Sequence, residues 1–457
     1  MAKLKDLKHS QEIIESYLQD DLDQELSPAE LARHLRHVHK SDVDLFIDYV
    51  KQLSSESLGD VAIELPDHIL KDVIEEISPE QLKDAIEELE SDDATDLLQN
   101  IEDINEEKAQ ELFDSLDDEY QEDIKRLRRY DDEEAGAYMQ TEVFVAKVEE
   151  KISDAIARLK QMKEEGEIEN IYRLFVVDDY ETLRFSIPLE DLITSDFSLT
   201  FKALVEKAPE DEYQPIFARD DDTIDSVIET VENYDLSVVP VIDYQGRLVG
   251  RITADDIHDI IQENATEQIY NLAGVNDEAE EENTLFEAGK SRAMWLFLNL
   301  FTAIVASLVI GIFDETIQAY VALAVLMPIV ASMGGNAGTQ TLTVTVRQLA
   351  LGDIDFQNAK STIVKEVSIA GINGVIFALV MGAIAFLWFH EAMLGVVIGL
   401  SMVINLLCAG LFGALIPLTL KRLDIDPAVG STVLLTTVTD VVGFFSFLGL
   451  AQWILLG

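Results

Sequence analysis

The sequence predicts a multidomain membrane protein with an α-helical superhelix, two α/β domains in tandem, a connecting helix and five transmembrane helices. Residues 1–135 place apolar side chains at helical spacing and contain no β-rich run. Residues 136–202 and 203–263 each combine short apolar strands with helices, and residues 264–290 form the connection. Residues 291–457 contain five apolar stretches, each long enough to cross a bilayer.

Charge divides the 457-residue chain sharply. The chain has 33 basic and 87 acidic residues, of which five basic and nine acidic residues lie from Ala293 onward. The other 28 basic and 78 acidic residues give residues 1–292 a net charge of −50, against −4 for the rest. A surface this negative repels nucleic acid and concentrates cations, so we expect no nucleic-acid partner. Solubility or adaptation to high salt would also account for a diffuse acidic surface.

The first 135 residues predict short helices that stack into a small superhelix. Helix stops followed by Ser, Asp or Pro start signals recur every twelve or thirteen residues, at 64–66, 77–80 and 90–93. Short helices of this kind cannot bury their apolar faces alone. Most of their acids are expected to be solvated, but the spacing of Asp92 and Asp96 places both on one side of a helix.

The two α/β segments resemble a pair of CBS domains. In the second copy, the strand 236–243 ends in a turn at Gln245 and Gly246, and the strand 248–253 leads into a helix. The first copy repeats this pattern at 174–179 and 186–192 but has Leu183-Arg184-Phe185 where a glycine is usual.

A long helix over residues 255–272 is predicted to lead out of the second copy toward the membrane domain. It is followed by an acidic joint with Asp277, Glu278, Glu280, Glu281 and Glu282. Two interpretations stay open, a mechanical connector and a plain spacer.

The membrane half contains five candidate spans, near residues 293–313, 318–347, 362–389, 394–420 and 428–456. All five basic residues of this half fall in the connections after spans two and four: Arg347, Lys360, Lys365, Lys421 and Arg422. Because basic residues favour the cytoplasmic side, this asymmetry predicts cytoplasmic N-terminal domains and a C-terminus outside the cell membrane.

The second span is predicted to be a broken helix that lines an ion path. Pro328 and three glycines interrupt it, and helix interiors disfavour both residue types. The alternative is that the small residues let two helices pack closely. Asn336 and Gln340 favour the ion path, because both amides need hydrogen-bond partners at membrane depth.

Asp440 is the clearest candidate for a functional residue in the membrane half. It lies in the middle of a span with no other charge between Pro427 and Gly457. An ionised aspartate there costs about 2.5–3.5 kcal/mol, which a hydrated cation on the ion path would offset. Thr436 and Thr437 precede it, either as helix-packing residues or as ligands for metal-bound waters. A lone carboxylate with hydroxyl and amide neighbours suits a hydrated divalent ion such as Mg2+.

These features together resemble the MgtE family of magnesium channels over essentially the whole chain. The order of domains, Pro328 with residues 335–340, residues 426–428 and residues 440–443 carry the resemblance. It implies a homodimer with the pore on its two-fold axis and Asp440 of each protomer facing a hydrated Mg2+. It also implies Mg2+ sites at acids that match the family: Asp92, Asp96, Asp225, Asp235, Asp256, Asp259, Glu267, Asp426 and, near the pore mouth, Glu366. Thr223, Asn264 and Gln268 stand where the family can have acids.

The expected function is Mg2+-selective uptake by a channel or transporter that cytoplasmic Mg2+ closes by bridging acids of different domains. One alternative is transport of another divalent cation, Co2+ or Mn2+, or a sodium-coupled exporter. A second is a membrane-anchored regulator whose CBS pair binds an adenine nucleotide such as ATP. No constellation of residues supports an enzyme.

Overall fold

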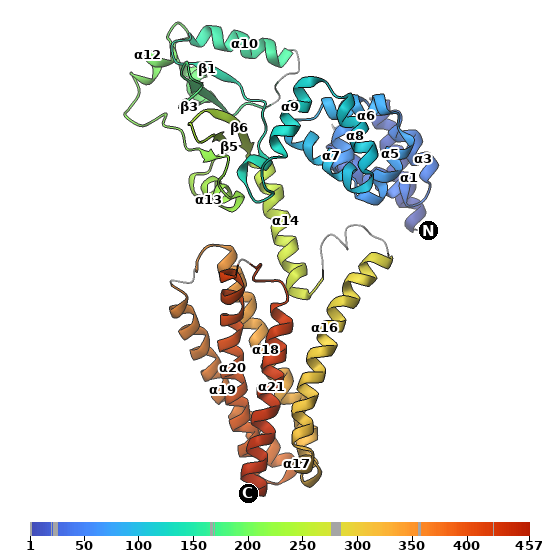
Figure 1. The fold of residues 1–457 in the computed structure, drawn as a ribbon, viewed down its shortest axis with the longest axis vertical. Helices are drawn as coiled ribbons and strands as arrows, with labels where there is room; N and C mark the ends of the chain where they lie inside the picture. The colour runs from blue at the N-terminus through green and yellow to red at the C-terminus, as the bar shows by residue number, and fades with distance from the viewer. Residues whose placement is uncertain are drawn as a thin grey trace. The chain divides into compact units, whose positions relative to one another are not determined.

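The structure is a computed structural model of residues 1–457 that divides into two compact units, residues 1–262 and 263–457 (Figure 1). It describes the chain except for residues 1, 20, 22–25, 165–167, 169, 276–284, 355–357 and 424, and except for the side chains of residues 2–6 and 285–288. The predicted acidic joint at Asp277 to Glu282 therefore lies outside the described residues.

The N-terminal part of the first unit is a stack of short helices, as predicted. They are α1 (Ala2–Leu18), α2 (Pro28–His39), α3 (Val43–Val50), α4 (Ser55–Ile63), α5 (Asp67–Glu76), α6 (Pro79–Glu87), α7 (Ser91–Ile104), α8 (Glu106–Ser115) and α9 (Asp118–Leu127). Polar caps start several of them: the hydroxyl of Ser27 accepts from the Glu30 amide, and that of Ser78 accepts from the Gln81 amide. Each cap satisfies a backbone amide that has no partner within its helix.

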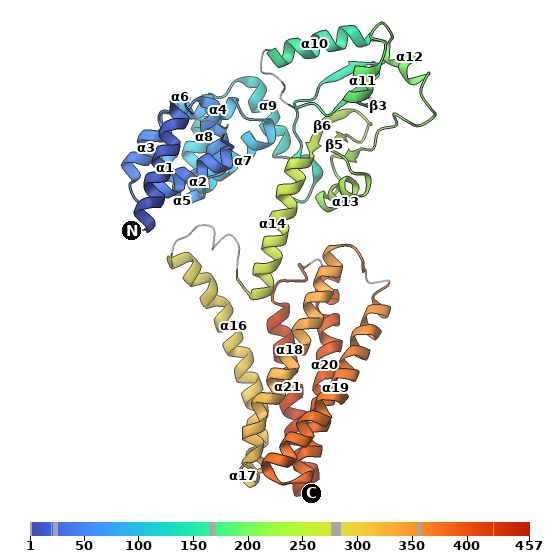
Figure 2. The same ribbon diagram turned by 180° about the vertical axis from the view of Figure 1, so that it is seen from behind.

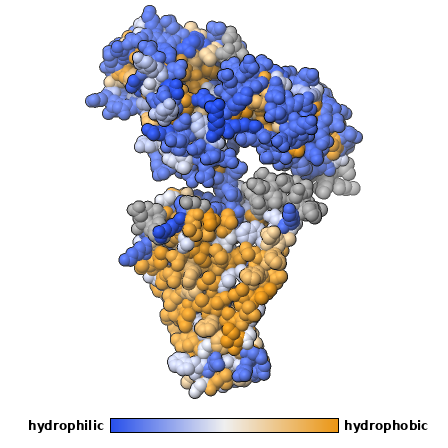
Figure 3. All heavy atoms as spheres, viewed as in Figure 1, coloured by the Kyte–Doolittle hydropathy of each residue, from blue (hydrophilic) through white to orange (hydrophobic). Residues whose placement is uncertain are grey.

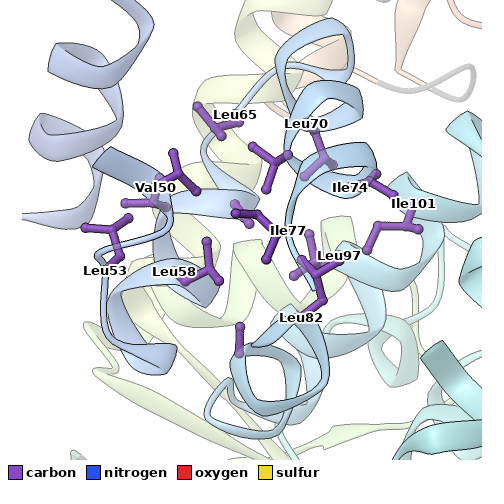
Figure 4. Close-up of a cluster of buried hydrophobic side chains, with 14 of the residues drawn as sticks. Val50, Leu53, Leu58, Leu65, Leu70, Ile74, Ile77, Leu82, Leu97 and Ile101 are labelled. Carbon is purple, nitrogen blue, oxygen red and sulfur yellow. The ribbon is translucent and has the colours of Figure 1, made fainter. Parts of the chain in front are cut away.

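One apolar core runs through this stack. Figure 4 shows how side chains from successive helices, among them Leu58, Ile77 and Leu97, meet in its middle. Gly59 of α4 lies close to α6, because a Cβ added at Gly59 would be 2.6 Å from the carbonyl oxygen of Ala85. The stack therefore depends on a glycine at this crossing.

The two α/β domains have the same sheet topology, β1-β2-β3 and β4-β5-β6. In each sheet the first two strands are parallel and the last two antiparallel. The first domain contains η1 (Ala135–Tyr138), β1 (Val145–Lys147), α10 (Ile152–Glu164), β2 (Arg173–Val177), β3 (Leu183–Pro188), α11 (Leu189–Thr194) and α12 (Phe201–Val205). The second contains β4 (Ala218–Arg219), α13 (Ile224–Tyr234), β5 (Val238–Ile242), β6 (Leu248–Thr253) and α14 (Ala254–Ala273).

Equivalent turns confirm that the two domains are repeats. Asp243 Oδ1 accepts from the amides of Gln245 and Arg247. In the first domain Asp178 Oδ1 accepts from the amides of Tyr180 and Thr182 in the same way. Glu181, with φ of +64°, occupies the left-handed position that Gly246 (φ +80°) takes in the second copy. The first turn thus keeps its shape without a glycine, at some backbone strain.

The second unit contains five helices that are long and apolar enough to cross a membrane, counted over the described residues. They lie in α16 (Leu285–Ile312), α18 (Ala322–Ala350), α19 (Ala359–Phe389), α20 (Ala392–Arg422) and α21 (Ser431–Ala451), which continues as a π-helical turn, η2 (Gln452–Leu456). The short helix α17 (Asp314–Ala319) connects the first two. Helix α20 contacts α18, α19 and α21, which run beside it (Figures 1 and 2). The face of these helices seen in Figure 3 is mainly hydrophobic, whereas that of residues 1–262 is mainly hydrophilic.

The predicted break in the second span is wrong. Helix α18 is continuous through Pro328 and the three glycines. Its glycines serve close packing instead, because a Cβ at Gly334 or Gly338 would overlap Asn405 of α20 or Leu435 of α21. The alternative interpretation, that small residues allow helices to approach, accounts for them.

We predict that Gly59→Ala destabilises the helical stack by about 1–3 kcal/mol, because the added methyl group would push against backbone rather than a movable side chain. Chemical denaturation of the full-length protein, followed by circular dichroism, measures the change. Glu56→Ala, at an exposed position of the same helix, is the control. Equal midpoints for the two variants would contradict the prediction.

Candidate functional site

A cluster of carboxylates forms where α7 and α14 begin, within the first unit. Asp92 and Asp93 occupy the first turn of α7, and Asp256 that of α14. The Asp92 side chain is 7% exposed. Burial, and then the nearby carboxylates of Asp93 and Asp256, hold the pKa of Asp92 well above its usual range. The charges that act most strongly on Asp92 are thus all negative.

Asp93 links this cluster to further acids. Burial, followed by the charges of Asp256, Asp96, Asp60 and Asp255, raises the pKa of Asp93 to about 7. Burial also raises the pKa of Asp256, with Asp255 and Asp259 adding to the effect, although bonds from Thr253 oppose it. Removing some of this repulsion requires protons or cations.

Local hydrogen bonds fix the acids in place. Asp92 Oδ1 accepts from the Asp93 amide (3.0 Å). Asp256 Oδ2 accepts from the Thr253 hydroxyl and from Gln140 Nε2 (3.2 Å). Ser91, beside Asp92, donates to Glu142 Oε2 (2.9 Å) and accepts from the Thr141 amide (2.8 Å). The start of α7 is therefore bound to the segment that precedes β1.

Arg251 of β6 is a buried cation in the same region, 4% exposed. Its Nη2 donates to Glu90 Oε1 (3.0 Å), its Nε donates to Gln140 Oε1 (3.0 Å), and its Nη1 donates to the Asn170 carbonyl. The guanidinium of Arg251, in the second α/β domain, is thus bonded to the N-terminal stack through Glu90 and to the first α/β domain through Asn170. It also fixes the Gln140 side chain, whose amide donates to Asp256. Neither Arg251 nor Asp93 was predicted as a site residue from the sequence, because the partners that give each its role lie far away in the chain.

The structure brings together only part of the predicted regulatory set. Asp92, Asp96, Asp256 and Asp259 gather in the cluster. Asp225 and Asp235 lie at opposite ends of α13, about 15 Å apart by helical rise. Among the described residues, no three His, Cys, Asp or Glu side chains are placed to hold a metal ion. A divalent ion at the cluster would need side chains to turn toward it, with water completing its shell.

Glu267 and Asp426 lie on either side of one side-chain amide in the second unit. Asn271 Nδ2 donates to Glu267 Oε1 (3.2 Å) and to Asp426 Oδ2 (2.9 Å), so one amide separates two carboxylates from different parts of the chain. The Ala428 amide donates to the other oxygen of Asp426 (2.8 Å). Both acids were predicted from the resemblance, whereas Asn271, a neutral residue, was not.

Asp440 lies in the middle of α21 and is half-buried. The described residues give its carboxylate no hydrogen bond or ion pair. Thr436 and Thr437 each donate to carbonyls of their own helix, at 2.9 Å to Thr432 and 2.6 Å to Val433. Their hydroxyl oxygens keep lone pairs that can accept from water.

The polar side chains of α18 and α19 differ in burial. Asn336 and Gln340 are exposed within this single chain, as is Pro328. Asn336 Nδ2 donates weakly to Ser332 Oγ (3.4 Å). Glu366 of α19 is only 6% exposed and accepts from the Thr341 hydroxyl of α18 (3.2 Å). This hydrogen bond joins the first third of α19 to the last third of α18.

The first α/β domain also has a cavity of about 630 Å3. Its lining includes Lys147 of β1, Arg158 of α10, Glu150 between these two elements, and Leu248 of the second domain. Arg158 Nη2 is bound to Glu150 (3.0 Å), so its charge is already compensated. Among the described residues, Lys147 Nζ donates only to the Asp178 carbonyl oxygen (3.4 Å), so the cavity is large enough for a nucleotide and keeps one positive charge for phosphates.

Known protein families match three parts of the chain. Family models match residues 327–450 (MgtE, divalent cation transporter), 26–133 (MgtE intracellular N domain) and 211–263 (CBS domain). Three curated relatives are named magnesium transporter MgtE. The one from Enterococcus faecalis is 33% identical over 330 residues, 72% of this chain and 71% of the relative. The chain belongs to the MgtE family.

A second relative, from Thermus thermophilus, is 30% identical over 348 residues, 76% of this chain and 75% of the relative. Among solved structures, the soluble part of a magnesium transporter is 27% identical, covers 57% of this chain and 99% of its own, and has a TM-score of 0.48. The CBS family model falls on the second copy, which carries the glycine that the first copy lacks. An MgtE fold is thus established in the expected order: helical N domain, CBS region and apolar C-terminal helices.

We predict that, without divalent ions, the first unit has a larger free energy of unfolding at pH 5.5 than at pH 8. The stability contributed by Asp93 is fully present below its usual pKa near 3.8 and is lost as the pH rises through about 7, because its folded-state pKa is raised. Calorimetry of the full-length protein in a chelator measures the transition at each pH.

Asp93→Asn should reduce this pH dependence, since an amide does not titrate. Glu107→Gln, at an exposed position of α8, should leave it unchanged and serves as the control. A pH dependence that persists undiminished in Asp93→Asn would assign it to other groups.

Proposed function

We propose that the protein is a Mg2+-selective channel or transporter for magnesium uptake, closed by cytoplasmic Mg2+. The single observation that carries this proposal is Asp440, a half-buried carboxylate in the middle of a membrane-spanning helix to which the described residues offer no basic or hydrogen-bonding partner. An ionised group at that depth needs compensation, and a hydrated cation supplies it. The names of the family relatives support Mg2+ as that cation and transport rather than catalysis.

Permeation is proposed to follow a path between two copies of the chain. Asn336, Gln340 and Pro328 are exposed on α18 in the single chain, which suits residues that face a partner or an aqueous path. Asp440 of each copy would then approach a two-fold axis, and Mg2+ would keep most of its waters while it passes. Thr436 and Thr437 would accept hydrogen bonds from those waters. Glu366 would position α18 through Thr341 near the mouth of this path.

The orientation proposed is the one that the basic residues predict, with the N-terminal domains in the cytoplasm and the C-terminus outside the cell membrane. Cytoplasmic Mg2+ would then reach the acid cluster of the first unit. At low Mg2+, the unscreened carboxylates of Asp92, Asp93 and Asp256 oppose the compact arrangement, because a Debye length near 8 Å leaves close pairs uncompensated. Bound ions would stabilise that arrangement and hence the closed state.

Further regulatory sites are proposed at the other acids that match the family. Glu267 and Asp426 lie on either side of the Asn271 amide, so an ion could replace the amide as their bridge. Asp225 and Asp235, being far apart on α13, would belong to different sites. Asp96 and Asp259 would complete the cluster around Asp256. The proposed domain limits are 1–135, 136–202, 203–263, 264–290 and 291–457.

Two alternatives have distinct outcomes. A carrier for Co2+ or Mn2+ would transport those ions in preference to Mg2+. A membrane-anchored regulator that binds ATP at the CBS pair would move no ion.

We expect Asp440→Ala to abolish Mg2+ uptake into proteoliposomes, because the variant loses the only carboxylate in the described part of that span. Glu315→Gln, an exposed acid in α17 between spans, is the control and should transport like the parent. Uptake of Mg2+ by Asp440→Ala at the parent's rate would refute the proposal. Competition by Co2+ and Mn2+ in the same assay decides between the cations.

We expect Asp256→Asn with Asp259→Asn to shift inhibition by internal Mg2+ to higher concentration without loss of conduction. Removing two carboxylates weakens ion binding at the cluster but leaves α21 unchanged. Patch recordings measure the inhibition curve, with Glu106→Gln plus Glu107→Gln on α8 as a charge-matched control. An inhibition curve equal to that of the parent would count against the cluster as the sensor.

A further inference from the structure

Asn405 is a polar residue at the centre of the membrane unit that the proposed function does not use. It lies in the middle of α20, the helix that contacts α18, α19 and α21. Its side chain is 0% exposed within a single chain. Its surroundings are therefore complete without a second copy of the protein.

The Asn405 amide forms a hydrogen bond between helices. Nδ2 donates to the Val330 carbonyl oxygen of α18 (2.9 Å). Its Oδ1 is buried and has no hydrogen-bond partner among the described residues. Buried polar atoms without partners are rare, and each one retained in a structure calls for an explanation.

Two glycines enclose this amide from opposite helices. A Cβ built on Gly334 of α18 would lie 2.2 Å from Asn405 Nδ2, and one built on Gly443 of α21 would lie 2.8 Å from it. The side chain of Asn405 thus touches the backbones of both helices. No larger residue than glycine fits at either position while the asparagine is present.

These two helices carry the residues proposed to contact the ion. Gly334 is two residues from Asn336 on α18, and Gly443 is three residues from Asp440 on α21. A leucine would fill nearly the same space as Asn405 without burying a free acceptor. If packing were the whole purpose, an apolar residue would be the more stable choice.

We propose that Asn405 is a positioning residue that sets the separation of α18 and α21, and with it the spacing between the amides of α18 and the Asp440 carboxylate. This inference rests on the proposed function of Mg2+ transport. The amide donates to α18 and fits against glycines of both helices, so its size and its hydrogen bond fix their separation. The spacing it sets would determine which hydrated cation fits.

The first experiment compares Asn405→Leu with the parent for uptake of Mg2+ and Co2+ into proteoliposomes, normalised to the amount of reconstituted protein. We expect Mg2+ uptake to fall at least about fivefold, the factor that one ordinary hydrogen bond represents, and the Mg2+ to Co2+ ratio to change. A residue with a purely structural role would lower both ions together. Ser401→Ala is the matched control, because Ser401 is equally buried on α20 but donates to Ile398 of its own helix.

The second experiment is a double-mutant cycle that does not depend on Asn405→Leu being well folded. Gly334→Ala should lose uptake, since its methyl group would overlap the Asn405 amide, and adding Asn405→Ala should restore part of it. Gly449→Ala is the control glycine, because its added Cβ would meet Phe313 at an ordinary 3.8 Å.

The outcomes separate this inference from the proposed function. If the parent itself transports no Mg2+, the proposed function fails. If the parent transports Mg2+ but Asn405→Leu keeps its rate and ion ratio, the positioning role is overturned while the function stands. Strictly additive effects of Gly334→Ala and Asn405→Ala would overturn it as well.

Discussion

Carboxylates that lack a basic partner impose the main physical constraint on both units of this protein. An acid removed from water must be protonated, paired or bound to a cation. In the soluble unit, burial and mutual repulsion raise the pKa of Asp92, Asp93 and Asp256. In the membrane unit, Asp440 stands alone in its span. A divalent cation such as Mg2+ would compensate the acids of both units.

Arg251 shows what a permanent cation does in this setting. It pairs with Glu90 and donates to Gln140, and so joins the helical stack to the α/β domains without a metal ion. The neighbouring acids have no such partner among their strongest charge interactions. A fixed arginine supports the interface at every ion concentration. Acids without a basic partner can bind mobile cations instead, so their contribution changes with the cation concentration.

Local patterns predicted the elements of the fold well. The start signals predicted at 64–66, 77–80 and 90–93 lead into α5, α6 and α7, and each of the five apolar stretches contains one long helix. The prediction failed at Pro328, because the cost of proline and glycine in an isolated helix is small beside the packing that glycine allows at a helix crossing. Helix propensity is a local quantity, and the neighbour of Gly334 is 71 residues away in the chain.

The candidate sites were predictable only where one residue stood out against its surroundings. Asp440 is the single charge of a span, and Asp92 with Asp96 share a helix face. Asp93, Arg251, Asn271 and Asn405 gain their roles from residues far away in sequence, and a lone asparagine or arginine carries no local signal. The resemblance to the MgtE family implied Mg2+ sites at Asp225 and Asp235, but the two residues lie at opposite ends of α13.

The most direct test of the central claim is the release of protons when Mg2+ binds. Asp93, whose pKa is raised to about 7, is partly protonated at neutral pH, and burial also raises the pKa of Asp92 and of Asp256. A protonated carboxyl group must lose its proton to bind a metal ion. Adding Mg2+ to the full-length protein in weak buffer at pH 7 should acidify the solution, and Asp92→Asn, Asp93→Asn and Asp256→Asn combined should remove that acidification. Mg2+ binding without proton release, or equal release from the parent and the triple variant, would contradict the account.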